Sequence, residues 1–366
     1  MIVPETLKKT PLYDEHLALN ARMVAFGGWE MPVQYEGILA EHKAARESVA
    51  LFDISHMGEF RIKGDALTSG LDRIVTMPIT DMPIKTCRYG AILNNEGGII
   101  DDLIVFREEQ EKWFLVVNGA TTEKDAQHFQ KHLTEKAAFQ DLSMDIGKLD
   151  VQGPQSRSVL SKLVKDIEKL KYYSFDYFEL LGEHVLISRT GYTGELGFEI
   201  YYPWNKTKEL WNVLLKDERV KPAGLGARDV LRLEVGYSLY GHELNEGVSP
   251  LESGLTRFID FNKDFIGKNA LLKEKEAGVK HKVVGFTSDN RRSPREQHKI
   301  FSSTNKEIGV VTSGSFSPCV QAGIGLGFVN SDSVKAGDKI LFGDEKNKTS
   351  AVITGKSFYK NGSLKN

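Results

Sequence analysis

A turn followed by an apolar strand with two adjacent acids restricts the fold of this chain more than any other feature. Gly97 and Gly98 predict the turn, because glycine adopts positive φ angles at little cost. The β-branched and aromatic residues at 99–106 then predict a strand. Side chains alternate along a strand, so Asp101 and Asp102 point to opposite faces. Both faces are apolar, and we therefore expect the strand to be buried on both sides.

The two acids in this strand need partners. An ionised carboxylate in an apolar layer costs several kcal/mol unless it is paired or hydrogen-bonded. At least one of the two must therefore have a partner or face a cavity. Two interpretations stay open: one acid caps the turn while the other pairs with a core arginine, or the pair marks a functional site. The alternation groups Asp101 with Ile99, Leu103 and Val105, and Asp102 with Ile100, Ile104 and Phe106.

Predicted strands and helices alternate in two similar passes along the chain. The first pass consists of a strand-rich stretch at 51–63, helix 65–75, strands 88–93, 99–106 and 113–118, and helix 121–133. This order is typical of a split βαβ, or ferredoxin-like, unit. A second pass begins near residue 138, with strand 144–152, helix 155–164, strands 177–181, 184–188 and 197–202, and helix 206–215. The repeated order predicts an α+β protein with two related halves, although no sequence repeat proves it.

The last part of the chain has a different pattern. A charged helix at 268–277 is predicted to be a linker. Short strands separated by turn residues follow it, as is typical of a small barrel or jelly roll. These strands are predicted at 283–286, 308–311, 324–329, 339–342 and 351–353.

A glycine-rich loop at 189–197 leads directly into a short strand that carries an acid. Such a loop allows the backbone to approach a flat ligand closely, and Glu199 offers an acceptor-only carboxylate to a ring with paired N–H donors. Further on, Arg228 lies near the start of a predicted helix, where exposed amides and a guanidinium favour an anionic group. The alternatives are that Glu199 faces solvent and that Arg228 forms a structural salt bridge with an aspartate.

Composition excludes several classes of function. The formal net charge of -2 gives no reason to expect a nucleic-acid partner. Cys87 and Cys319 are the only cysteines, which is too few for a disulfide framework and predicts a reducing, cytoplasmic environment. Residues 1–10 contain no apolar segment typical of a secretory signal, and no run is long enough to predict a membrane span. The histidines lack the spacing of metal ligands, so we expect no metal site.

Taken together, several motifs resemble those of the T-proteins of the glycine cleavage system, the aminomethyltransferase family. The resemblance is carried in order by residues 26–33, 52–59, 97–103, 189–198, 224–234 and 312–318. It covers essentially the whole chain without large gaps. Each motif alone is weak, but their order makes the resemblance specific.

The family resemblance implies a three-domain cloverleaf around a central hole that binds tetrahydrofolate as co-substrate. It implies a folate-binding α+β domain at 1–50 and 138–275, a ferredoxin-like domain at 51–137 and a barrel domain at 276–366. It also implies the reaction: the aminomethyl group on the lipoyl arm of H-protein gives 5,10-methylenetetrahydrofolate, ammonia and a dihydrolipoyl arm. Lipoylated H-protein is therefore the expected partner.

The resemblance also implies roles for individual residues. The family's essential acid matches Asp102, the pterin-binding pair matches Tyr192 and Glu199, and the folate-binding arginine matches Arg228. Residues that resemble parts of the cavity wall are Met57, Tyr89 and Val116. Phe106 stands where some relatives have tyrosine, and the tail at 358–362 differs from parts of the family. A carboxylate at Asp102 has three open roles: it steers the folate N10, stabilises a developing cation or accepts a proton.

Other proteins of similar fold are the alternatives. Folate-dependent demethylases differ on the substrate side of the cavity, which the sequence does not reveal. A non-enzymatic folate-binding factor has a Lys-Gly-Cys motif, whereas residues 264–268 here contain no cysteine. Fused sarcosine and dimethylglycine dehydrogenases have an N-terminal flavin domain, which the sequence before Thr10 does not contain. Basic residues of the last domain are expected either to steer an acidic H-protein or to form a solvated surface; they are Arg291, Arg292, Arg295, Lys335, Lys339 and Lys346.

Overall fold

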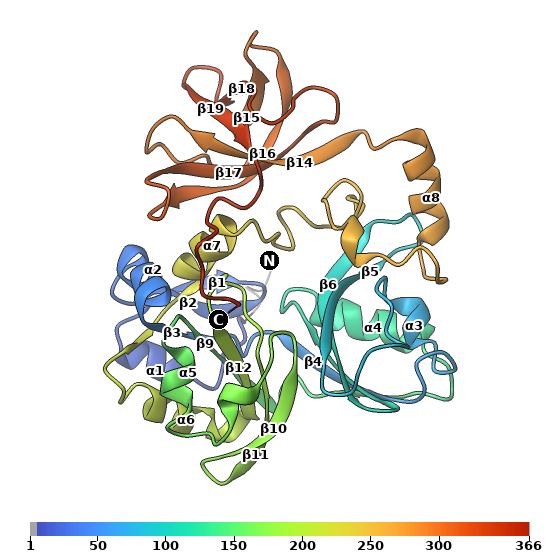
Figure 1. Cartoon of the computed structure of the whole chain (residues 1–366), viewed down its shortest axis with the longest axis vertical. Helices are drawn as coiled ribbons and strands as arrows, with labels where there is room; N and C mark the ends of the chain where they lie inside the picture. Colours follow the sequence, from blue (N-terminus) through green and yellow to red (C-terminus); the bar gives the residue numbers. More distant parts are fainter. Residues whose placement is uncertain (1–5, 366) are drawn as a thin grey trace.

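The computed structural model describes residues 6–365 and has three lobes that meet at the centre of the molecule (Figure 1). Each lobe is built on its own sheet: one has six strands, one has five, and the third is a closed barrel. The α+β fold with a C-terminal barrel is therefore confirmed. Residues 1–5, in which the sequence predicts no secretory signal, lie outside the described part.

The first lobe contains a sheet in the order β10-β11-β12-β9-β3-β13, with β13 parallel to β3. Its strands are β3 (Val49–Asp53), β9 (Ile146–Gln152), β10 (Phe175–Leu180), β11 (Glu183–Ser188), β12 (Gly197–Pro203) and β13 (Val220–Pro222). Its helices are α1 (Tyr13–Ala18), α2 (Ile38–Glu47), α5 (Ser156–Leu160), α6 (Thr207–Leu214) and α7 (Leu225–Glu234). A small hairpin, β1 (Arg22–Phe26) and β2 (Trp29–Gln34), lies beside them.

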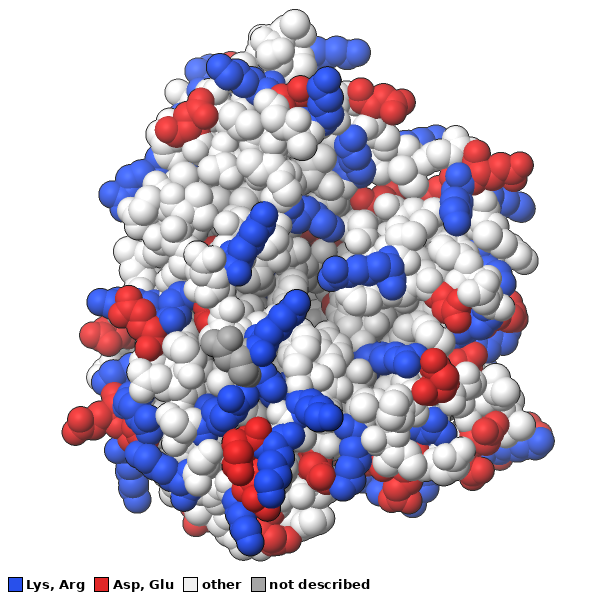
Figure 2. Space-filling model, in the orientation of Figure 1, with Lys and Arg blue, Asp and Glu red and all other residues white. Residues whose placement is uncertain are grey.

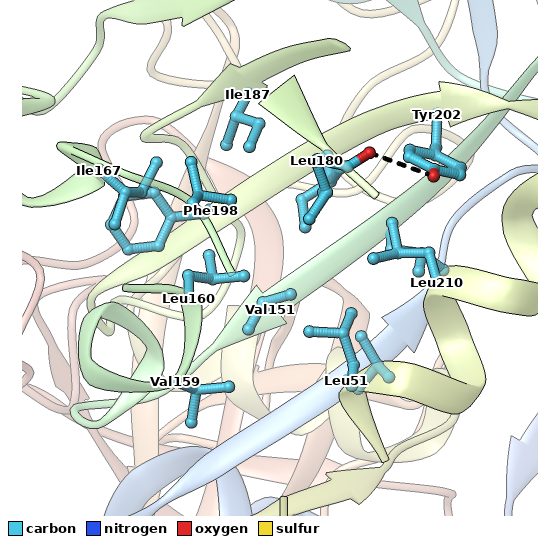
Figure 3. Packing of buried hydrophobic residues seen from close by; sticks show 14 of the residues in the cluster. Leu51, Val151, Val159, Leu160, Ile167, Leu180, Ile187, Phe198, Tyr202 and Leu210 are labelled. Carbon is cyan, nitrogen blue, oxygen red and sulfur yellow. Dashed lines mark hydrogen bonds between the residues drawn. The ribbon is translucent and has the colours of Figure 1, made fainter. Parts of the chain in front are cut away.

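One face of this sheet forms the core of the first lobe (Figure 3). Val151 of β9 and Phe198 of β12 pack there against Leu160 of α5 and Leu210 of α6, and the Tyr202 hydroxyl donates to the Leu180 carbonyl at 3.3 Å. Because side chains alternate, the residues between these core positions are turned to the opposite face. On β9 and β12 that opposite face carries Lys148, Asp150, Glu199 and Tyr201.

The second lobe contains a sheet in the order β5-β6-β7-β4-β8. Its strands are β4 (Gly58–Lys63), β5 (Cys87–Leu93), β6 (Ile99–Glu109), β7 (Lys112–Val117) and β8 (Ala138–Asp141), and its helices are α3 (Leu71–Ile74) and α4 (Thr122–His132). Phe129 of α4 packs with Leu103 and Val105 of β6 in the core of this lobe. Ile100 joins the same core, contrary to the simple alternation, because the β5–β6 register shifts at this point.

The predicted helix at 65–75 is wrong over its first half. The Asp65 carboxylate accepts hydrogen bonds from the amides of Leu67 and Thr68, which favours a turn, and Gly70 has a φ of 83°. The helix α3 begins only at Leu71.

Two strands do not fit the domain boundaries expected from the sequence. β3 begins before residue 51 and pairs with β9 of the first lobe along Ala50–Asp53, whereas β8 begins at residue 138 and pairs with β4 of the second lobe. The domain limits themselves remain a prediction.

The two sheets face one another across a layer of aromatic side chains. Phe106 and Phe114 of the second lobe contact Phe175 and Tyr201 of the first, with ring centroids 5.2 Å apart in the pairs Phe106–Phe175 and Phe114–Tyr201. Phe106, the position where some relatives have tyrosine, is fully buried in this layer. The layer fixes the distance between the faces that carry Asp102 and Glu199.

The third lobe is a closed barrel in the order β14-β17-β16-β15-β18-β19, reached through α8 (Lys268–Ala277). Its strands are β14 (His281–Ser288), β15 (Lys299–Ser302), β16 (Glu307–Ser317), β17 (Ala322–Asn330), β18 (Lys339–Gly343) and β19 (Lys348–Thr354). The sequence did not predict β15. After β19 the chain returns to the first lobe (red in Figure 1), where the amides of Phe358 and Tyr359 donate to the Glu234 carbonyl.

Candidate active site

Asp102 lies on β6, on the face that is turned toward the first lobe. Its Oδ2 accepts a hydrogen bond from the Tyr89 hydroxyl at 2.9 Å, and its Oδ1 accepts one from the Asn118 side chain at 2.9 Å. Burial and the neighbouring Asp101 raise the pKa of Asp102 to about 7. The residue nevertheless keeps part of its surface accessible. Both protonation states of the Asp102 carboxyl group are therefore populated at neutral pH.

Asp101 has a different environment on the opposite face. It is fully buried and accepts hydrogen bonds from the Asn118 amide at 2.9 Å and from its side chain at 2.8 Å. Burial and Asp101 together raise the pKa of Asp125, on α4, to about 10. Asn118 donates two hydrogen bonds to Asp101, and the neighbouring Asp125 is neutral. These neighbours explain how the Asp101 carboxyl group is accommodated in the core.

Glu199 is buried in β12, so the interpretation that it faces solvent is wrong. Its Oε2 accepts hydrogen bonds from the Thr190 hydroxyl at 2.7 Å and from the Tyr201 hydroxyl at 3.3 Å, and it lies 3.6 Å from Lys148 Nζ. Among residues 6–365, each hydrogen bond to the Glu199 side chain ends on Oε2. Oε1 remains an acceptor for a ligand.

Arg228 lies in the first turn of α7 and forms the structural salt bridge that was one of the two interpretations. Its Nη1 donates to Asp150 Oδ2 at 2.7 Å. The guanidinium also lies over the Tyr192 ring, 5.0 Å from its centre. Burial raises the pKa of Asp150 to about 7, although Arg228 lowers it. The salt bridge uses one guanidinium nitrogen, so it does not exclude a further ligand contact.

Tyr192, in the glycine-rich loop of the first lobe, lies near Asp102 of the second. Its ring is stacked on Tyr237 with centroids 5.7 Å apart, and its hydroxyl donates to the Ser238 carbonyl. Burial raises the pKa of Tyr192, and the charge of Asp102 adds to the rise. An electrostatic effect of this kind requires Asp102 of the second lobe to lie near Tyr192 of the first.

The remaining predicted wall residues lie around these groups. Tyr89 contacts Asp102 directly, and Val116 pairs with Ile104 across β6 and β7. Met57 follows β3, with its Sδ 3.7 Å from Lys148 Nζ. The structure thus connects Asp102 with Tyr89, Tyr192 with Arg228, and Met57 with Glu199 through Lys148.

Three residues at this site were missed by the sequence analysis: Asn118, Lys148 and Asp150. Lys148 and Asp150 alternate with apolar residues in β9, a pattern also typical of a strand with one solvent-facing side. Both are buried here because a second sheet covers that side. Asn118 directly follows the apolar strand β7, and a polar residue at the end of an apolar strand is a sequence signal that could have identified it.

One group of side chains within residues 6–365 has the donor set of a metal site: His42, Glu234 and Cys319, whose ligand atoms lie within 4.8 Å of one another. The Arg46 guanidinium lies 2.6 Å from the same Glu234 oxygen that contacts His42. A cationic side chain already neutralises this carboxylate.

In the described residues, no helix combines the length and apolar character needed to cross a bilayer.

Comparisons with known proteins agree with this arrangement. A family model described as the GCVT N-terminal domain matches residues 12–263, and one described as the glycine cleavage T-protein C-terminal barrel domain matches residues 281–360. The fold and site therefore define a protein of the GCVT class.

Individual relatives place the chain more narrowly. It is 41% identical to an aminomethyltransferase of Desulforamulus reducens over 97% of this chain and 99% of that protein. It is 44% identical to an aminomethyltransferase of Halothermothrix orenii over 91% and 95% of the two chains. The crystal structure of the glycine cleavage system aminomethyltransferase T from Bartonella henselae matches 98% of this chain and 99% of that one, with a TM-score of 0.92 and 31% identity. This chain belongs to the aminomethyltransferase family.

Proposed function

We propose that this enzyme transfers the aminomethyl carbon from the lipoyl arm of H-protein to tetrahydrofolate. The products are 5,10-methylenetetrahydrofolate, ammonia and the dihydrolipoyl arm. The observation that carries the proposal is the pair of carboxyl groups on facing sheets: Asp102, which titrates near neutral pH, and Glu199, with one free oxygen. Membership of the aminomethyltransferase family supports the assignment.

The residues present fit a reduced folate. A pterin ring offers adjacent N–H donors, which match the free Oε1 of Glu199. The stacked pair Tyr192 and Tyr237 provides an aromatic surface for a flat group, and Arg228 provides a cation for a carboxylate. Met57, Tyr89 and Val116 complete the binding wall in this proposal.

Bound tetrahydrofolate supplies the N5 and N10 amines that accept the methylene carbon. The protein contributes position and charge. Asp102, held between Tyr89 and Asn118, places a carboxylate of fixed orientation beside the reacting atoms. In its ionised form it stabilises positive charge that develops as the amine leaves, or it accepts the proton released there. Both roles require the carboxylate form.

In this proposal the partner is lipoylated H-protein, whose lipoyl arm enters where the three lobes meet. Figure 2 shows a hollow at the centre of this face with lysine and arginine side chains around it. Such a rim attracts an acidic partner and raises the association rate more than the final affinity. The domain limits expected from the sequence belong to the same proposal: the domain of residues 1–50 and 138–275 supplies Tyr192, Glu199 and Arg228, and the domain of residues 51–137 supplies Asp102 and the wall residues Met57, Tyr89 and Val116.

The reaction is tested by turnover of aminomethylated H-protein with tetrahydrofolate, beside a parallel assay with methylated sulfonium donors. We expect turnover only with H-protein; methyl transfer from the sulfonium compounds alone would make the chain a demethylase.

The folate site is tested by calorimetric titration of Glu199→Gln and Arg228→Ala with tetrahydrofolate. Loss of a charge-assisted hydrogen bond weakens binding by about 1.5–3 kcal/mol, or roughly ten- to a hundred-fold. Glu179→Gln is the matched control, because this acid is exposed on β10 of the same sheet. Dissociation constants equal to that of the control would remove both residues from the site.

A further inference from the structure

A lysine is buried between the two facing sheets, behind the proposed folate site. The Lys148 side chain is only 1% exposed. Its Nζ lies 3.6 Å from Glu199 Oε2, 3.7 Å from Met57 Sδ and 4.9 Å from the centre of the Tyr201 ring. An ammonium group so deep in a protein needs an anionic partner. Glu199 is the acid that contacts it.

An acid on the opposite sheet lies in the same layer. Glu59 of β4 is fully buried, and within residues 6–365 neither of its carboxyl oxygens has a hydrogen-bond partner. Burial raises the pKa of Glu59 well above its ordinary value, although Lys148 lowers it. Because a carboxylate without donors is costly in such a place, Glu59 is neutral at physiological pH.

The other titratable groups near Glu199 and Lys148 are neutral or already paired. Burial lowers the pKa of His56 to about 4, with Arg228 and Lys148 adding to the shift, so its ring is neutral. Burial raises the pKa of Tyr201, Tyr173 and Cys87, so all three are neutral at physiological pH. Asp150 on β9 pairs with Arg228 at 2.7 Å. Within the described residues, Lys148 is the one cation that forms an ion pair with Glu199.

We propose that Lys148 is a positioning residue that keeps Glu199 ionised and holds its Oε2, so that Oε1 faces a ligand with two adjacent N–H donors. This inference rests on the proposed function, because it concerns how the same site recognises the pterin ring. The hydroxyls of Thr190 and Tyr201 bind the same oxygen as Lys148. Together they fix one side of the carboxylate and leave the other for the ligand.

Replacement of the lysine by an apolar residue of similar length gives a distinct result. In Lys148→Met, the Glu199 carboxyl loses its counter-ion, and the loss of that charge favours the protonated form. A protonated carboxyl accepts hydrogen bonds less strongly, so tetrahydrofolate affinity falls roughly tenfold at pH 7. Ionisation is restored as the pH rises, so the affinity of the variant recovers toward the wild-type value in alkaline solution.

The experiment is a titration with tetrahydrofolate from about pH 6 to about pH 9, a range over which a displaced carboxyl group titrates. Lys148→Arg keeps the charge and should restore most of the affinity. Glu59→Gln replaces one neutral group by another and should leave binding and its pH dependence unchanged. Circular dichroism verifies the fold of each variant, and Lys148→Gln replaces Lys148→Met if the latter does not fold.

A second readout does not need folate. The infrared spectrum of Lys148→Met is compared with that of the double variant Lys148→Met, Glu199→Gln, and the difference should show the C=O stretch of a protonated carboxyl. The difference between the wild-type protein and Glu199→Gln, in which Lys148 is intact, should not show this band. Equal tetrahydrofolate affinity of Lys148→Met and wild type at every pH, or the absence of that infrared band, would overturn the inference. Failure of the wild-type protein to bind tetrahydrofolate would instead refute the proposed function, and the infrared comparison would still decide the role of Lys148.

Discussion

The substitution Asp102→Asn separates the charge of this residue from its contacts. The two hydrogen bonds to the carboxylate come from the Tyr89 hydroxyl and the Asn118 side chain. An asparagine retains both contacts, because its oxygen accepts from Asn118 while its NH₂ group donates to the Tyr89 oxygen. The fold should therefore survive, and the substitution should remove only the negative charge that we propose acts on the reacting atoms.

The expected loss follows from this geometry. Removing one preoriented electrostatic group from an active site costs about 2.7–4 kcal/mol of transition-state stabilisation, so turnover should fall by about 10²- to 10³-fold. The pH profile should change as well. Burial and Asp101 raise the pKa of Asp102 to about 7, and in the proposed mechanism the carboxylate is the active form. Wild-type turnover at saturating tetrahydrofolate should therefore rise with pH through about 7, and this rise should be absent in Asp102→Asn.

The assay is steady-state formation of 5,10-methylenetetrahydrofolate from aminomethylated H-protein, with thermal unfolding recorded for each variant. Asp101→Asn is the control, because Asp101 points into the core of its lobe and should affect turnover less than Asp102. Equal losses in the two variants, or wild-type turnover in a folded Asp102→Asn protein, would refute the role of Asp102.

Three further predictions concern stability and the partner. Arg46→Met should destabilise the protein by about 3–5 kcal/mol, because buried Glu234 loses the guanidinium 2.6 Å away; an unchanged denaturation midpoint would contradict this. Since the pKa of Glu59 is raised in the folded state, the unfolded chain binds fewer protons above about pH 4.5 and stability falls as pH rises. In Glu59→Gln this decrease of stability with pH should be absent, and denaturation curves recorded at several pH values measure it. Association with H-protein should slow as salt increases, because exposed charges are screened beyond about 8 Å at physiological ionic strength. Charge reversal at Arg291 and Arg292 should reduce both the rate and its salt dependence in stopped-flow experiments, whereas a rate unaffected by either would place the contact on another face.

Much of the architecture was predictable from local sequence patterns. The linker helix, most of the barrel strands and the helices that begin near residues 121 and 225 have clear periodicity or turn chemistry, and the structure contains them. The expected helix at 65–75 failed because one aspartate side chain bonds to nearby amides and forms a turn. Helix propensity alone does not reveal that competition.

The candidate site was predictable only in part. Alternation along β6 correctly placed Asp101 and Asp102 on opposite faces, and the helix start at Arg228 was correctly located. The interpretation of Arg228 as a salt-bridge partner was also correct, but the sequence could not identify Asp150 as its partner. The two residues are 78 positions apart in the chain. Contacts over such separations depend on which strands pair and which faces meet.

The sequence by itself determined that two acids occupy one strand and point to opposite sides, because this follows from backbone geometry that every strand shares. It also determined the family, through motifs that persist in order along the chain. Only the tertiary structure decided that the sheet carrying Asp102 covers the polar face of β9 and β12. That packing buries Lys148 against Glu199 and leaves Glu59 without a partner, since the charge balance of a buried layer depends on both of the surfaces that form it.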